Sequence, residues 1–70
     1  MNLEEAFVLI KTLEEHPDYV DWQIRTGDLE NYDHDDGYSC YICIGRGANW
    51  KYAKTVPEAI GLAVEYAFGD

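Results

Sequence analysis

Apolar residues near the start of the chain recur at helical spacing, which predicts an amphipathic helix over residues 2–15. Asn2 and Glu5 are spaced as in a capping box, so we expect the helix to begin there. It ends at His16-Pro17, because the residue before a proline is displaced from the α region. The side chains expected to form its buried stripe are Leu3, Ala6, Phe7, Ile10 and Leu13.

Farther along the chain the apolar period changes to two, which is typical of half-buried strands. Residues 19–26 and 38–44 are predicted to be two such strands. In the first, the expected core side is Val20, Trp22 and Ile24, and the opposite side is Tyr19, Asp21, Gln23 and Arg25. In the second, the expected core side is Cys40, Ile42 and Ile44.

A third strand is predicted at residues 50–54, after a short glycine-rich hairpin at 45–49. It is short, so we expect it at an edge of the sheet. The sequence leaves two alternatives for the side chains of this strand that face water, which are either Trp50 and Tyr52 or Lys51 and Ala53.

A second helix is expected to start at Thr55, which has the spacing of a capping box with Glu58, and Gly69 would end it. Its buried stripe would be Val56, Ala59, Ile60, Ala63, Val64 and Ala67. The element order is α-β-β-β-α. We therefore expect one α+β domain over residues 1–70, in which two helices pack on one face of a three-stranded antiparallel sheet, because the strands alternate and their connections are short.

Two cysteines, Cys40 and Cys43, form a C-x-x-C pattern, which can signal redox chemistry or half of a zinc site. On a strand, however, residues three apart face opposite sides of the sheet, so the two thiols cannot share a bond or a metal ion. The remaining candidate ligands, His16 and His34, do not have metal-ligand spacing. We expect structural cysteines, no metal and no cofactor.

Charge is distributed unevenly between the two halves of the chain. Residues 1–36 hold eleven acidic residues against two basic ones, whereas residues 37–70 hold three of each, so the net charge of −9 lies in the first half. A net negative charge of this size repels nucleic acid and anionic membranes, and it favours a partner with a basic surface. We therefore expect no direct contact with nucleic acid or membrane.

The densest acidic stretch, residues 28–36, has three interpretations. It can be a solvated loop, a surface for a basic partner, or a calcium-binding loop. An EF-hand loop needs a ligand at position 5 and a glutamate at position 12. Counted from Asp33, these positions are Gly37 and Ile44, so the calcium interpretation fails. Aromatic residues near carboxylates can anchor an interface. The candidate anchors are Tyr32, Trp50 and Tyr52. The alternative is that Trp50 and Tyr52 pack under the helices or along the sheet edge.

Signals for an enzyme, a membrane span or a secretory leader are not found in the sequence. There is no G-x-S-x-G or Walker motif, and no apolar run approaches the ~20 residues of a membrane helix. Glu4 and Glu5 stand where a signal peptide would be basic. We expect a non-enzymatic, cytoplasmic protein that is a monomer or a weak homodimer.

Two segments of the second half carry a resemblance to known families. Residues 37–44 and the run Lys54-Thr55-Val56-Pro57-Glu58-Ala59-Ile60 resemble the phage ABA-sandwich domain and the HicB-type antitoxin fold. In type, a small, acidic, aromatic-rich chain is also similar to phage-encoded inhibitors of host defence, including anti-CRISPR proteins. Double-stranded RNA-binding domains share the element order, but Pro57-Glu58 stands where they need lysines.

These likenesses, together with the charge pattern, lead to a functional hypothesis. The chain would be a phage-type inhibitor whose acidic surface binds a basic, nucleic-acid-binding groove of a CRISPR or other defence effector in the host cell. The alternative is a HicB-like antitoxin or accessory phage protein that binds one protein partner through its sheet. The candidate partner-binding residues are Asp28, Glu30, Tyr32, Asp33, Asp35 and Asp36 in the loop, with Glu14, Glu15, Asp18 and Asp21 expected to extend the same surface.

Overall fold

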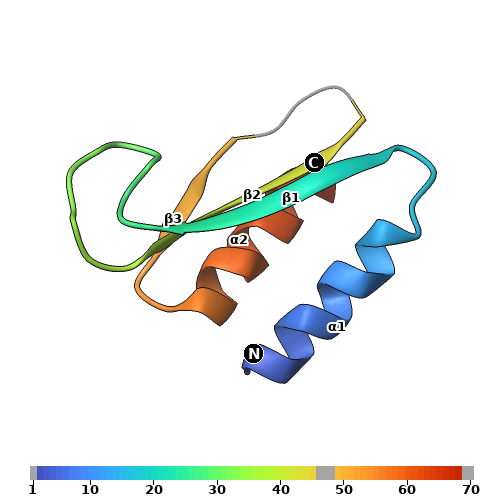
Figure 1. The fold of residues 1–70 in the computed structure, drawn as a ribbon, viewed down its shortest axis with the longest axis horizontal. Helices are drawn as coiled ribbons and strands as arrows, with labels where there is room; N and C mark the ends of the chain where they lie inside the picture. The colour runs from blue at the N-terminus through green and yellow to red at the C-terminus, as the bar shows by residue number, and fades with distance from the viewer. Residues whose placement is uncertain (1, 46–48, 69–70) are drawn as a thin grey trace.

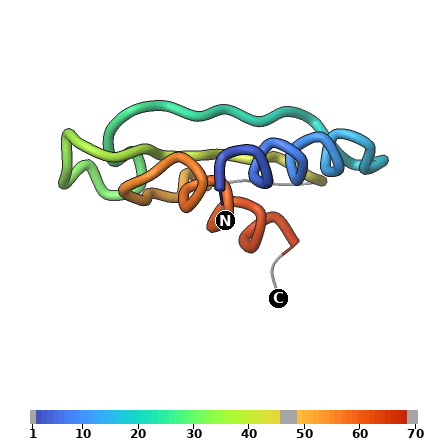
Figure 2. The backbone as a smooth tube through the Cα atoms, turned by 90° about the horizontal axis from the view of Figure 1, so that it is seen from below, coloured from blue at the N-terminus to red at the C-terminus, as the bar shows by residue number. Residues whose placement is uncertain are grey.

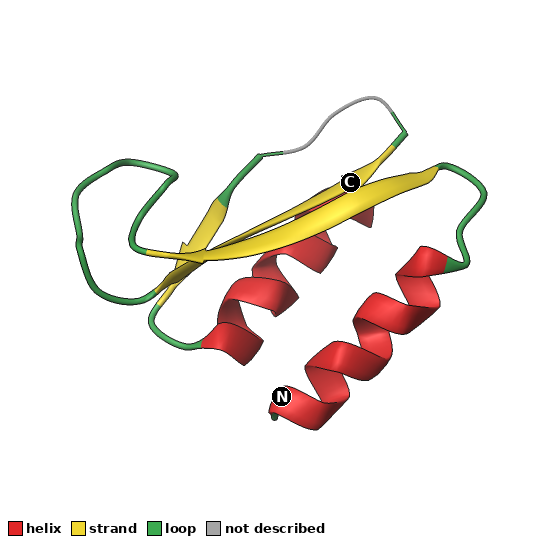
Figure 3. Ribbon diagram, viewed as in Figure 1, coloured by secondary structure: helices red, strands yellow, loops and turns green. Residues whose placement is uncertain are grey.

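A computed structural model of the chain describes residues 2–45 and 49–68. Its elements follow the predicted order (Figures 1 and 3): α1 (Leu3–Glu14), β1 (Tyr19–Thr26), β2 (Tyr38–Ile44), β3 (Lys51–Ala53) and α2 (Val56–Phe68). The middle of the predicted hairpin, 46–48, and the helix stop at Gly69 lie outside the described residues.

The three strands form one antiparallel sheet in the order β1-β2-β3. Figure 1 shows both helices on the same side of this sheet, so the predicted α+β architecture is confirmed. Register places Tyr38 opposite Ala53, and both side chains pack against the core. The Lys51/Ala53 side of β3 therefore faces the helices, and the Trp50/Tyr52 side faces away from them.

The core lies between the sheet and the two helices. Its fully buried side chains are Ala6, Ile10, Leu13, Cys40, Ile42, Ala59, Ile60 and Ala63. Small residues on α2 allow the helix backbone to approach the sheet closely, because an alanine occupies little of the space between them. Burying this set supplies most of the driving force for folding, at about 25 cal/mol per Å² of apolar surface.

Two residues of the expected stripe on α1 do not join the core. Leu3 and Phe7 are 49% and 42% exposed, so the prediction of a stripe that includes them is wrong at these positions. Phe7 instead packs edge-on against Trp22 of β1, with ring centroids 6.2 Å apart. Phe7 therefore lies over an outer strand of the sheet and not among the fully buried side chains of the core.

Alternation in β1 is broken near its start. Register shifts between Tyr19, which pairs with Ile44, and Asp21, which pairs with Cys43. Val20 is the extra residue of this bulge and is 61% exposed, so its predicted place on the core side is wrong. Because Tyr19 pairs with Ile44, which packs against the core, Tyr19 lies on the helix side of the sheet, also contrary to expectation.

Both helix starts are capped as predicted. The Glu5 amide donates to Asn2 Oδ1 at 2.8 Å and the Asn2 amide donates to Glu5 Oε1 at 3.0 Å, which completes the capping box of α1. At α2 the Glu58 amide donates to Thr55 Oγ1 at 3.4 Å. The Thr55 hydroxyl in turn donates to Glu58 Oε1 at 2.8 Å.

Candidate functional site

The acidic segment between β1 and β2 is a compact loop at one end of the sheet (Figure 1). We call residues 27–37 the acidic loop. Its two ends are joined by a hydrogen bond from the Gly27 amide to the Gly37 carbonyl, at 3.0 Å. Ser39, fully buried, ties the base further: its hydroxyl donates to the Gly27 carbonyl at 2.7 Å and accepts from the Leu29 amide at 2.8 Å. The loop is therefore a closed structure rather than an extended acidic chain.

Asp28 is part of the internal frame of this loop. It is only 4% exposed, and its Oδ1 accepts hydrogen bonds from the amides of Glu30 and Asn31 at 3.0 and 2.9 Å. Its own amide donates to the His34 carbonyl at 3.0 Å. A carboxylate used in this way is not presented to a partner, so the structure places Asp28 outside the exposed acidic surface.

Two further carboxylates of the loop are paired with lysines of the third strand and its end. Glu30 lies 3.5 Å from the Lys51 ammonium and also accepts the Tyr52 amide at 3.3 Å. Asp36 lies 2.9 Å from the Lys54 ammonium. These contacts fasten the loop to β3 and neutralise two of its five carboxylates, which the sequence pattern did not anticipate.

The Asp36–Lys54 pair also changes the acid–base behaviour of its members. The hydrogen bond and charge of Lys54 lower the pKa of the Asp36 carboxyl below its ordinary value. In return, the hydrogen bond and charge of Asp36 raise the pKa of Lys54. Both groups are exposed to solvent, so the pair acts at the surface and is screened by salt.

The tip of the acidic loop carries its accessible groups. Tyr32 is 81% exposed and has a positive φ of 63°, a conformation that non-glycine residues adopt rarely. Asp33 and Asp35 are exposed on either side of His34. Within residues 2–45 and 49–68, neither aspartate has an ion-pair partner. An aromatic ring beside two unpaired carboxylates is the part of the loop best placed to meet a partner.

The remaining predicted site residues lie elsewhere. Glu14, Glu15 and Asp18 flank the start of β1, whereas the acidic loop follows its end, so the eight-residue strand separates the two groups (Figure 1). Asp21 pairs with Cys43 on the sheet face away from the helices. The structure thus divides the predicted acidic set between two ends of the sheet and does not join it into one surface.

The sheet face away from the helices carries an aromatic cluster. Tyr41 and Trp50 lie with ring centroids 5.3 Å apart, and the Arg25 guanidinium carbon lies 6.0 Å from the Trp50 ring centroid. Such cation–π contacts contribute about 0.5–1 kcal/mol at exposed sites. Both described helices lie on the other side of the sheet, so this face is a second surface able to contact a partner.

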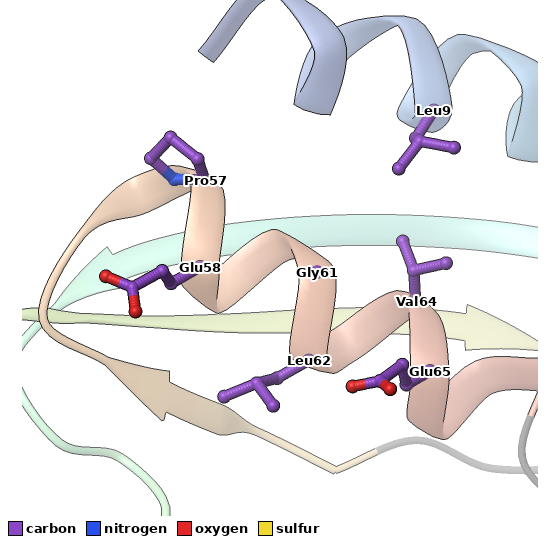
Figure 4. A pocket seen from close by; sticks show the side chains of 7 residues that line it. All are labelled: Leu9, Pro57, Glu58, Gly61, Leu62, Val64 and Glu65. Atoms are coloured by element: carbon purple, nitrogen blue, oxygen red, sulfur yellow. The ribbon is translucent and has the colours of Figure 1, made fainter. Parts of the chain in front are cut away.

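An apolar groove of about 520 Å³ lies between the two helices. Figure 4 shows Leu9 of α1 and Val64 of α2 pointing toward one another across it. Two glutamates of α2, Glu58 and Glu65, also line the groove, and no basic residue does.

The two cysteines face opposite sides of β2, as the strand assignment predicted. Cys40 is fully buried in the core, and Cys43 is half-buried on the other face; both are free thiols. Burial raises the pKa of the Cys40 thiol to about 11. The part of the chain that the structure describes holds no group of three His, Cys, Asp or Glu side chains placed to bind a metal ion.

Comparisons with known proteins add no identity to this geometry. No family model matches the chain, and neither the curated proteins nor the solved structures contain a match. Neither described helix has the length and apolar character needed to cross a membrane.

Proposed function

We propose that this protein is a non-enzymatic binding module that docks the tip of its acidic loop on a basic, nucleic-acid-binding groove of a partner protein. The single observation that carries the proposal is the arrangement of Tyr32, Asp33 and Asp35 on a loop whose base is closed by hydrogen bonds. A loop that is already ordered loses little conformational entropy when it binds.

The mechanism is competition for the groove. Complementary charge raises the rate of encounter and sets the orientation, while a desolvated aromatic ring supplies much of the contact energy. In this scheme Asp33 and Asp35 occupy sites that phosphates would otherwise fill, and Tyr32 inserts between basic side chains. In its specific form the proposal is the phage-type, anti-CRISPR-like inhibitor: a host defence effector loses its nucleic acid when the module binds in the host cytoplasm.

The proposal is tested with two variants of equal charge change. Asp33→Lys/Asp35→Lys reverses the tip, and Glu14→Lys/Glu15→Lys makes the same change at the far end of β1. Proteins captured from host lysate at low and high salt are identified, purified and tested for displacement of bound nucleic acid by the module. We expect capture that is lost at high salt, displacement of nucleic acid, and a binding constant at least about tenfold weaker for the tip variant alone.

Equal loss in the two double variants would mean that overall charge, and not the loop tip, determines binding. Capture that persists at high salt without displacement of nucleic acid would also contradict the proposal. Tyr32→Ala adds a check on the aromatic contact, because it leaves every charge in place.

A second candidate function is favoured by the aromatic cluster on the open sheet face. There the module would bind one protein partner through Tyr41 and Trp50, as a HicB-like antitoxin or accessory phage protein would. Capture that survives high salt and is lost in Trp50→Ala, while the tip variant binds normally, would favour this function over the first.

A further inference from the structure

The free edge of β1 is the longest unpaired backbone surface on the sheet. β1 has eight residues and is an outer strand, whereas β3, the other outer strand, has three. Figure 2 shows β1 along one margin of the molecule, with α1 on its inner side and no other described segment beyond it. A long open edge is a template for pairing with another strand.

The protein covers its other edge. On β3, the outward amide of Tyr52 donates to the Glu30 carboxylate at 3.3 Å, and Lys51 is held between Glu30 and the Tyr66 ring, 4.6 Å from the ring centroid. The acidic loop therefore caps β3 with a side chain. Nothing in the described part of the chain does the same for β1.

The backbone groups that β1 offers can be identified from its pairing with β2. The Gly27 amide bonds to the Gly37 carbonyl, in continuity with the antiparallel register of the two strands. In an antiparallel ladder, alternate residues direct both backbone groups to the same neighbour. Residues 21, 23 and 25 therefore bond to β2, and the amides and carbonyls of Trp22 and Ile24 point to the free edge.

Charges on β1 are self-complementary in one register. If two copies of β1 pair antiparallel about a two-fold axis at Gln23, Trp22 of each copy stands opposite Ile24 of the other, and their free backbone groups meet. The same register places Asp21 of each copy directly opposite Arg25 of the other, so the dimer contains two Asp21–Arg25 pairs. Opposite charges at facing positions stabilise a strand pair, and like charges destabilise it.

Neighbouring registers lack this match. If the two-fold axis lies at Trp22, Asp21 faces Gln23. If it lies at Ile24, Arg25 faces Gln23 and Asp21 faces Gly27. An axis at Asp21 or at Arg25 places that residue opposite its own copy, so that like charges face each other. The bulge at Val20 lies before the five residues 21–25 that the favoured register uses, so it does not interrupt the new ladder. Apolar contact is available on the helix side, where Phe7, 42% exposed, touches Trp22.

We propose that two copies of this chain associate through β1 into a six-stranded antiparallel sheet, with Asp21 and Arg25 exchanged across the two-fold axis. The partner is expected to be a second copy of this chain and not a strand of another protein. Two-fold symmetry forms both Asp21–Arg25 pairs from the residues of β1 alone. The helical groove is a poor alternative for self-association, since it would bring Glu58 and Glu65 of two acidic copies together. The association does not depend on the acidic loop.

A charge-swap experiment tests the register. Asp21→Arg and Arg25→Asp each place like charges at both facing pairs, so we expect dimerisation measured by sedimentation velocity to weaken roughly 10- to 100-fold in either single variant. Mixing the two single variants restores opposite charges in the heterodimer. The double variant Asp21→Arg/Arg25→Asp restores them in the homodimer. Both should sediment as dimers at the wild-type concentration range.

Folding of each variant is checked by circular dichroism, and amide exchange gives an independent measure. In the wild-type protein, the amides of Trp22 and Ile24 should become protected from exchange as the protein concentration rises. In the single variants, the same two amides should stay unprotected. A wild-type chain that stays monomeric at every concentration would refute the proposal. The proposal would also be refuted if the single charge changes left dimerisation intact and Leu62→Lys, in the helical groove, abolished it.

Discussion

The imidazole ring of His34 stacks on the phenol ring of Tyr52, with ring centroids 5.3 Å apart and planes inclined by 17°. This contact joins the tip region of the acidic loop to the third strand. The same tyrosine lies against Gly37 at the loop base and within 3.5 Å of Asp36 Oδ1. Tyr52 is thus the point at which the loop is held to the sheet.

Gly37 should tolerate no larger residue. Its φ is +79°, and an added Cβ would lie 2.7 Å from the Tyr52 ring and 2.8 Å from the Ala53 carbonyl oxygen. We expect Gly37→Ala to lower the free energy of unfolding by about 2–4 kcal/mol, from backbone strain and overpacking together. Gly45→Ala is the matched control, because its φ is +74° but nothing lies within 4 Å, and it should cost only about 1 kcal/mol. Urea unfolding measures both, and equal losses would show that the contact with Tyr52 does not matter.

Asp28 should act on stability and not on partner binding. Asp28→Ala removes the acceptor for two amides and should cost about 1.5–3 kcal/mol, as for hydrogen bonds to charged groups. Asp28→Asn keeps an oxygen in place and should cost less. Hydrogen exchange at the Glu30 and Asn31 amides should accelerate in the alanine variant. Unchanged protection of these amides would mean that Asp28 does not hold the turn.

The Asp36–Lys54 pair should leave a signature in pH titration. Because pairing lowers the Asp36 pKa, its contribution to stability is present above the ordinary value of 3.8 and is lost as pH falls through the lower folded value. Lys54 has a raised pKa, so its contribution is present below 10.5 and is lost as pH rises through the folded value. NMR titration of the Asp36 carboxyl should show its pKa returning toward 3.8 in Lys54→Met. Lys11→Met, which removes a lysine on α1, should leave it lowered.

The two thiols should differ in reactivity. At mildly alkaline pH, iodoacetamide should modify Cys43 in the folded protein and Cys40 only after urea is added, because Cys40 is buried and its pKa is raised to about 11. This raised pKa contributes stability that is present below 9.0 and is lost as pH rises through about 11. Mass spectrometry of Cys43→Ser, which keeps only the buried thiol, gives the cleanest measurement. Fast labelling of that variant when folded would contradict the buried placement.

Local patterns were sufficient to predict β1, β2 and both helix starts, whereas the third strand, predicted at 50–54, spans only Lys51–Ala53. The alternation at 19–26 and 38–44 gave the observed bounds of β1 and β2, and Asn2 and Thr55 cap their helices as expected. What alternation could not predict was the bulge at Val20, because one extra residue changes the side of Tyr19 without changing the composition of the strand.

The acidic loop was predictable only in outline. Its exposed tip follows from its polar composition, but the pairing of Glu30 and Asp36 with Lys51 and Lys54 depends on strand register, which brings β3 beside the loop from about twenty residues away. The burial of Asp28 had a local signal, since an aspartate often accepts amides two and three residues on. In the sequence alone, that signal was outweighed by the surrounding charge.

The closed base of the acidic loop makes the domain a small display scaffold. Gly27, Gly37 and Ser39 keep the loop ends together through contacts that do not involve residues 32–35. Tyr32, Asp33 and Asp35 can therefore be exchanged for other residues, while His34 keeps its stacking contact with Tyr52 and the sheet and helices stay as they are. A library randomised there would present constrained loops on a 70-residue frame that has no disulfide to form, since both of its cysteines are free thiols.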